Sequence, residues 1–252
     1  MANAEIVAIG SELLLGQIVD TNSAWIAKRL SNHGLNLFFK TVVGDNPDRM
    51  KQSLIQAMNR SDIVITSGGI GPTQDDITRE IVSEASGLNL VLDPKLLSQI
   101  KQRFQDRGLI MTKNNERQAY IPQGAIPIEN PNGTAPAFIV ENGNNVVISL
   151  PGVPFELKWL FKNEVIPYLT RKFNLSEIIA YRVLKVTDMG ESSVDDKIGH
   201  LIATSKNPTV GVLAHPGQVD IRITAKAQNQ EEAEALIEPI DREVRTLLGN
   251  HI

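Results

Sequence analysis

The sequence of 252 residues contains no cysteine and only four histidines. Without cysteine the chain can form neither a disulfide nor a thiolate metal site, and this composition suits a cytoplasmic protein. No two of the histidines stand at a metal-ligand spacing from each other, so the usual histidine-based metal site is not expected. The lack of cysteine and the spacing of the histidines therefore argue against metal sites built from thiolates or from paired histidines.

Several other signatures are missing. No window approaches eighteen consecutive apolar residues, so no membrane-spanning helix is expected, and no signal peptide is visible. The sequence has neither the G-x-x-x-x-G-K-[ST] loop of ordinary ATPases nor the G-x-S-x-G nucleophile elbow. The formal net charge of −4 argues against a general nucleic-acid binder, whose footprint is basic.

What the chain does have is a 42% share of hydrophobic residues, enough for a substantial core. Strand-like and helix-like patterns alternate over the first 170 residues, which predicts an α/β domain with a largely parallel sheet. The expected strands are 4–9, 35–43, 62–66, 137–140 and 145–150. The expected helices are 22–33, 47–60, 76–86, 94–107, 112–120 and 155–170.

The pattern changes at residues 172–176, which predicts one domain over 1–172 and a second over 176–252. The second domain has the order β-α-β-β-α, compatible with a small α+β fold. Its expected strands are 178–187, 209–214 and 218–227, and its expected helices are 191–204 and 230–249. A further strand could begin at 250–252, so the chain is either a natural short form or a piece truncated at its last strand.

The loop between strand 62–66 and the next helix carries the strongest chemical signal. It contains Gly68, Gly69 and Gly71, followed by Asp75 and Asp76. Glycines let backbone N–H groups converge on an anion, and an adjacent helix N-terminus favours negative charge. Two carboxylates beside an anion are best explained by a divalent cation. The alternative is a tight turn that needs glycine for its backbone geometry.

Polar residues also follow the first strand, and they leave the same edge of the predicted sheet. Glu12 and Asp20 could face the site, while Asn22 could contact a ligand or cap the next helix. Helix capping explains Asp20 and Asn22 equally well when each is taken alone. Glu12, between two apolar stretches, is harder to explain in that way.

Two further loops could join the site. Residues 130–137 include Asn132, Gly133 and Thr134, a turn sequence whose amide and hydroxyl could also contact phosphate or ribose. Residues 150–154 include Gly152 and lead into a helix with Glu156 in its first turn. This second loop is interpreted equally well as a lid, an anion site or a rigid turn.

Taken together, these segments resemble the CinA family (competence/damage-inducible proteins). The N-terminal domain of that family is related to the molybdopterin-binding proteins MoaB and MogA and to gephyrin. The matching segments are 10–16 with 20–22, 67–78, 130–136 and 150–156. The resemblance implies a three-layer α/β/α first domain with a mostly parallel sheet. Residues 183–186, 190–193 and 207–211 resemble the KH-like middle domain of the family.

For the first domain the resemblance implies a metal-dependent ADP-ribose pyrophosphatase that gives AMP and ribose 5-phosphate. Asp75 and Asp76 would bind Mg²⁺ or another divalent ion, which lowers the pKa of a bound water, and Glu12 would be a metal ligand or general base. The implied nucleotide-binding residues are Gly68, Gly69, Gly71, Thr73, Asp20, Asn22, Asn132, Gly133, Thr134 and Gly152.

Two other functions stay open. The same site could bind or adenylylate molybdopterin, or the chain could be a non-catalytic nucleotide-binding adaptor in DNA uptake or damage response. A nucleic-acid partner is not favoured, because residues 176–252 contain no G-x-x-G loop. Relatives indicate a homodimer. Nothing in the sequence matches the third domain of many CinA proteins, which deamidates nicotinamide mononucleotide.

Overall fold

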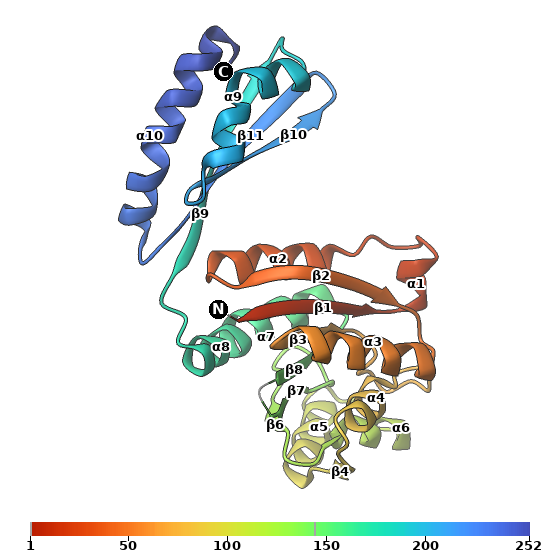
Figure 1. Ribbon diagram of the computed structural model, residues 1–252. Helices are drawn as coiled ribbons and strands as arrows, with labels where there is room; N and C mark the ends of the chain where they lie inside the picture. The colour runs from red at the N-terminus through yellow and green to blue at the C-terminus, as the bar shows by residue number, and fades with distance from the viewer. Residues whose placement is uncertain (1, 144) are drawn as a thin grey trace. The chain divides into compact units, whose positions relative to one another are not determined.

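The computed structural model describes residues 2–143 and 145–252, and these divide into two compact units (Figure 1). The first unit comprises the chain up to Leu30 together with Leu35–Asn174, and the second comprises Ser31–Gly34 and Leu175–Ile252. The second unit takes over the chain between Asn174 and Leu175. Among the residues that the structure describes, no helix combines the length and the hydrophobicity of a membrane span.

The first unit is built on a six-stranded sheet with the order β2-β1-β3-β8-β7-β6. Strands β1, β2, β3 and β8 are parallel, whereas β7 and β6 run antiparallel to their neighbours. The strands are β1 (Asn3–Ile9), β2 (Asn36–Val43), β3 (Ile63–Ser67), β6 (Ile126–Ile128), β7 (Ala137–Asn142) and β8 (Asn145–Leu150). The largely parallel sheet that the sequence predicts is therefore confirmed.

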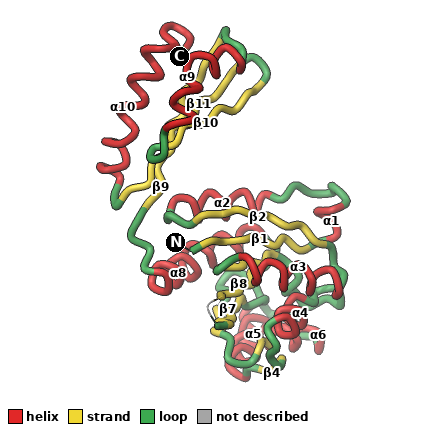
Figure 2. The backbone as a smooth tube through the Cα atoms, in the orientation of Figure 1, coloured by secondary structure: helices red, strands yellow, loops and turns green. Residues whose placement is uncertain are grey.

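Helices cover both faces of this sheet, as Figures 1 and 2 show. Met50, Leu54 and Ile81 pack on one face against alternate strand residues such as Val7 and Val64. The intervening strand residues are also buried, and a T-shaped contact joins helices on the opposite face, with the Trp25 and Phe161 ring centroids 5.7 Å apart. The helices are α1 (Ser11–Leu14), α2 (Thr21–Asn32), α3 (Pro47–Arg60), α4 (Thr78–Ala85), α5 (Pro94–Asp106), α6 (Lys113–Glu116), α7 (Pro154–Leu160) and α8 (Ile166–Phe173).

Three short strands were not predicted, because segments of three residues carry no alternation. These are β6 and the two-stranded pair β4 (Leu90–Leu92) and β5 (Tyr120–Pro122). The predicted helix 112–120 consists of α6 and a single 3₁₀ turn, Arg117–Ala119 (η1). The predicted helix 155–170 is interrupted by a π-helical turn, Phe161–Val165 (η2).

The second unit has a three-stranded antiparallel sheet with the order β10-β11-β9 and two helices packed on it. Its elements are β9 (Ile178–Thr187), α9 (Glu191–Thr204), β10 (Thr209–His215), β11 (Gln218–Ala227) and α10 (Gln230–Leu248). The predicted β-α-β-β-α order is confirmed. The prediction that a further strand begins at residues 250–252 is wrong, because Gly249–His251 form a 3₁₀ turn (η3).

Candidate active site

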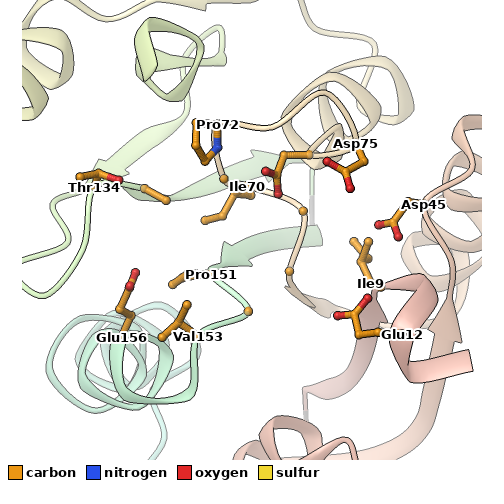
Figure 3. Close-up of a pocket in the computed structure, with 17 residues that line it drawn as sticks. Ile9, Glu12, Asp45, Ile70, Pro72, Asp75, Thr134, Pro151, Val153 and Glu156 are labelled. Atoms are coloured by element: carbon orange, nitrogen blue, oxygen red, sulfur yellow. The ribbon is translucent and has the colours of Figure 1, made fainter. Parts of the chain in front are cut away.

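A cavity of about 420 Å³ opens at the carboxyl ends of β1, β3 and β8, where ligands collect in open α/β sheets (Figure 3). Many of the residues predicted for the site line it. They are Glu12, Gly68, Gly69, Gly71, Asp75, Asp76, Thr134 and Gly152. The parallel pairing of β1 with β3 and of β3 with β8 brings most of these loops together, and the antiparallel pairing of β7 with β8 adds the loop of Thr134.

The glycine loop fits its surroundings so closely that side chains are excluded at several positions. A Cβ on Gly68, where φ is +107°, would lie 2.4 Å from the carbonyl oxygen of Ile9. A Cβ on Gly69, where φ is +67°, would lie 2.2 Å from the hydroxyl oxygen of Thr78. The glycines therefore allow close approach to β1 and to α4 as well as the turn itself.

The backbone donors of this loop are not equivalent. The N–H of Gly68 donates to the carbonyl of Leu150 at 3.0 Å. Gly68 therefore contributes to the site by its small size and not as a hydrogen-bond donor to phosphate. Within the described chain, no hydrogen-bond acceptor is shown for the N–H groups of Gly69, Ile70 and Gly71. All three residues line the cavity, so their N–H groups are candidate donors to a ligand.

Arg79 binds the carbonyl groups of the glycine loop, although the sequence did not identify it as a site residue. It lies in the first turn of α4 and is only 1% exposed. Its guanidinium donates to the carbonyl of Ile70 and, at 3.2 and 3.3 Å, to that of Gly71. Burial lowers the pKa of Arg79 to about 10, so it remains a cation at neutral pH. Its guanidinium thus occupies the carbonyl groups of Ile70 and Gly71.

Asp75 and Asp76 share the hydroxyl of Thr73. The Thr73 hydroxyl lies within hydrogen-bond distance of Asp75 Oδ1 and 2.5 Å from Asp76 Oδ2, which also accepts from the Thr73 N–H at 2.9 Å. The predicted helix start at residue 76 is two residues too early, since α4 begins at Thr78. Both carboxylates therefore belong to the loop, and Thr73 acts through them, because it does not itself line the cavity.

The Thr73→Val variant tests this pairing. The Thr73 hydroxyl is the main cause that lowers the pKa of Asp75, and the charge of Arg117 lowers it further. Without the hydroxyl the pKa of Asp75 should rise toward its ordinary value, so Asp75 should become protonated at a higher pH than in the wild type. Carboxyl chemical shifts followed by NMR during a pH titration measure the change. Thr204→Val, at an exposed site in the second unit, is the control, and an unaltered Asp75 pKa in Thr73→Val would contradict the assignment.

The Asp20–Asn22 element lies beside this cavity rather than on it. Asp20 Oδ1 accepts from the N–H of Ser23 at 2.9 Å, which is the capping role. The Asn22 amide donates to the Gly152 carbonyl at 2.7 Å and to the Ser67 hydroxyl at 3.3 Å. Both residues line a smaller cavity of about 100 Å³ that shares Glu12 and Gly152 with the larger one.

Of the three site residues predicted in the 130–137 loop, only one lines the cavity. Thr134 lines the cavity, and the buried Gln118 donates to its hydroxyl oxygen at 3.3 Å. Asn132 and Gly133 do not line it. Their N–H groups instead donate to Asn130 Oδ1, each at 3.1 Å, so the two residues shape the loop that carries Thr134.

Two carboxylates on the cavity were not predicted as site residues. Asp45 follows β2 and accepts from the N–H of Ser11 at 2.8 Å. Glu156 enters from the first turn of α7, at the end of the cavity away from Asp75 (Figure 3). For Asp45 a sequence signal did exist, because it stands two residues after the end of β2, which runs parallel to β1.

Family comparisons cover almost the whole chain. The model of the "Probable molybdopterin binding domain" matches residues 5–171, and that of the "Damage-inducible protein CinA KH domain" matches residues 181–252. A competence-damage inducible protein of Clostridium botulinum (strain Loch Maree) is 45% identical over 249 residues. A CinA-like protein of Dictyoglomus thermophilum is 46% identical over 248 residues.

These alignments cover 99% and 98% of the chain but 60% of each relative, so the chain spans about 60% of the length of the curated relatives it matches. Among solved structures, that of CinA from Thermoplasma acidophilum, of unknown function by its own description, is 38% identical with a TM-score of 0.62. That match covers 66% of this chain and 97% of the other.

Proposed function

The chain belongs to the CinA family, and from that membership and the cavity we propose that it is a metal-dependent ADP-ribose pyrophosphatase. One observation carries the proposal. Paired carboxylates that share one hydroxyl stand beside three loop N–H groups for which no acceptor is shown in the described chain. This combination suits a diphosphate held jointly by backbone donors and a cation.

The carboxylates fit a cation that binds together with the phosphate. Within the described residues, no group of three or more acidic or histidine side chains could hold a metal ion alone. Asp75 and Asp76 supply two oxygen ligands, and Mg²⁺ commonly takes one or two carboxylates and completes its shell with water and phosphate oxygens. When bound, the cation would screen the carboxylates from the diphosphate and withdraw charge from its oxygens.

Other residues of the cavity would bind the phosphates, position the glycine loop and accept a proton. Gly69, Ile70 and Gly71 bind phosphate oxygens through their N–H groups, and Arg79 holds that loop in place. Glu12 is exposed and lines the cavity, so it can accept a proton from water that attacks one phosphorus. The bond from that phosphorus to the bridging oxygen then breaks, and AMP and ribose 5-phosphate leave.

A second candidate is molybdopterin binding or adenylylation, which the family model of residues 5–171 favours by its description. Molybdopterin also carries a phosphate, so the same loop and carboxylates would serve it. The two proposals differ in the product: pyrophosphatase action releases AMP from ADP-ribose, whereas the alternative leaves ADP-ribose intact.

The test is incubation of the chain with ADP-ribose and a divalent metal, followed by chromatography for AMP and ribose 5-phosphate. We expect both products in equal amounts, none in the presence of a chelator, and slower release when molybdopterin competes for the site. Intact ADP-ribose with every divalent metal, together with measurable molybdopterin binding, would reverse the preference between the two candidates.

A further inference from the structure

Glu156 is a cavity carboxylate for which the proposed reaction has no task. In Figure 3 it lies with Thr134, Pro151 and Val153 at one end of the cavity, while Asp75, Asp45 and Glu12 lie at the other. An acceptor-only group repels phosphate and cannot donate to it. Its position therefore marks the part of the ligand that carries hydroxyl groups rather than charge.

The Glu156 carboxylate is held in place by a buried amide. Asn130 is 2% exposed, and its Nδ2 donates to Glu156 Oε2 at 2.6 Å and to the carbonyl of Ala135 at 3.0 Å. Its Oδ1 accepts from the two N–H groups of the following turn. The amide of Asn130 thus links the carboxylate to the loop that bears Thr134.

Gly133 supports the same placement. A Cβ on this residue would lie 2.2 Å from Glu156 Oε2, so the carboxylate packs directly against the glycine backbone. A glutamate in the first turn of a helix also interacts favourably with the helix N-terminus. That role alone requires neither the buried amide nor the direct packing on Gly133.

We infer that Glu156 recognises the vicinal diol of a ribose, with Thr134 beside it, and so restricts the substrate class to diphosphate compounds whose ribose at this end carries a free diol. Two neighbouring hydroxyls can donate to the two oxygens of one carboxylate, and the apolar Pro151 and Val153 border the sugar. This inference rests on the proposed function, since it places the diphosphate at the glycine loop and the sugar at the end of the cavity that Glu156 occupies.

The test is a cycle of one substitution and two analogues. Equilibrium binding is measured by calorimetry for ADP-ribose, for its analogue lacking the 2′-hydroxyl on the adenosine ribose, and for its analogue lacking that hydroxyl on the terminal ribose. In all three ligands a methylene group replaces the bridging oxygen of the diphosphate, so that none is hydrolysed. The Glu156→Gln variant keeps the shape but replaces an acceptor oxygen by a donor. Glu164→Gln, an exposed glutamate of η2 that follows α7, is the matched control.

For the wild type and Glu164→Gln we expect one of the two analogues to bind about tenfold to one-hundredfold more weakly than ADP-ribose, as for hydrogen bonds to a charged group. In Glu156→Gln the ratio for that analogue should fall to about one. The analogue that shows the effect identifies which ribose occupies this end.

Three results would count against the inference. Equal binding of all three ligands by the wild type would overturn it while leaving the pyrophosphatase proposal intact. A ratio that persists in Glu156→Gln would assign the diol to other residues. No binding of ADP-ribose by the folded wild-type chain would overturn both proposals together.

Discussion

The Asp75→Asn/Asp76→Asn double variant is expected to lose about a thousandfold in ADP-ribose turnover while keeping the thermal stability of the wild type. Asparagine preserves the shape of each side chain and can still accept from Thr73. It removes the two negative charges that would hold the cation beside the diphosphate. Stability should change little, because both residues lie in a loop outside the core, where Asp75 is exposed and Asp76 is half-buried.

Turnover should be measured at saturating metal, so that a weakened metal affinity and a lost catalytic contribution can be separated. The Asp48→Asn variant, at an exposed position in the first turn of α3, is a control for the change of charge. Wild-type turnover in a correctly folded double variant would remove both aspartates from the mechanism.

The Gly68→Ala variant is expected to be the most destabilising of the substitutions considered. The added methyl would lie 2.4 Å from the Ile9 carbonyl, and both β1 and β3 are buried, so neither strand can move aside. Overpacking combined with a φ of +107° should cost about 2–4 kcal/mol of unfolding free energy. Turnover should fall as well, since the loop donors would shift.

Urea unfolding followed by tryptophan fluorescence measures this cost in the first unit, because the two tryptophans of the chain, Trp25 and Trp159, both lie there. The control is Gly87→Ala, where φ is +67° and nothing lies within 4 Å of an added Cβ. It should cost only about 1 kcal/mol. Equal losses in the two variants would show that the contact with Ile9 is not the cause.

The elements best predicted from the sequence are those with strong local signals. Helix α3 occupies the predicted residues 47–60, because Asn46 caps it by accepting from the N–H of Arg49 and Pro47 occupies its first position. Helix α9 also coincides with its predicted range. The strands β4, β5 and β6 depend on tertiary pairing, since three residues carry no periodicity of their own.

The site was predictable to the extent that parallel strands bring their carboxyl ends together. Glu12 and the glycine loop could be placed at one edge from this rule. Thr134 reaches the same edge because it precedes β7, which runs antiparallel to β8. Arg79 could not, because a charged residue in a helical pattern is ordinarily expected to be exposed. Its burial follows from the need of the Ile70 and Gly71 carbonyls for a donor, which only the folded loop shows.

Which side chains of the predicted polar loops line the cavity depends on how the folded loops pack, and the sequence alone does not show this. Asn132 and Thr134 are two residues apart, yet Thr134 lines the cavity and Asn132 does not. Asp20 serves as a helix cap, which was one of the two interpretations open from the sequence. The type of residue marks a candidate, whereas the direction of the backbone determines whether it reaches the ligand.

A ³¹P NMR time course of ADP-ribose with the purified chain and Mg²⁺ tests the central claim most directly. The account predicts that the diphosphate signals disappear and that two monophosphate signals, from AMP and ribose 5-phosphate, grow in equal amounts. The same sample with Asp75→Asn/Asp76→Asn protein should remain unchanged over that period. Diphosphate signals that persist with folded wild-type chain, across a series of divalent metals, would contradict the account.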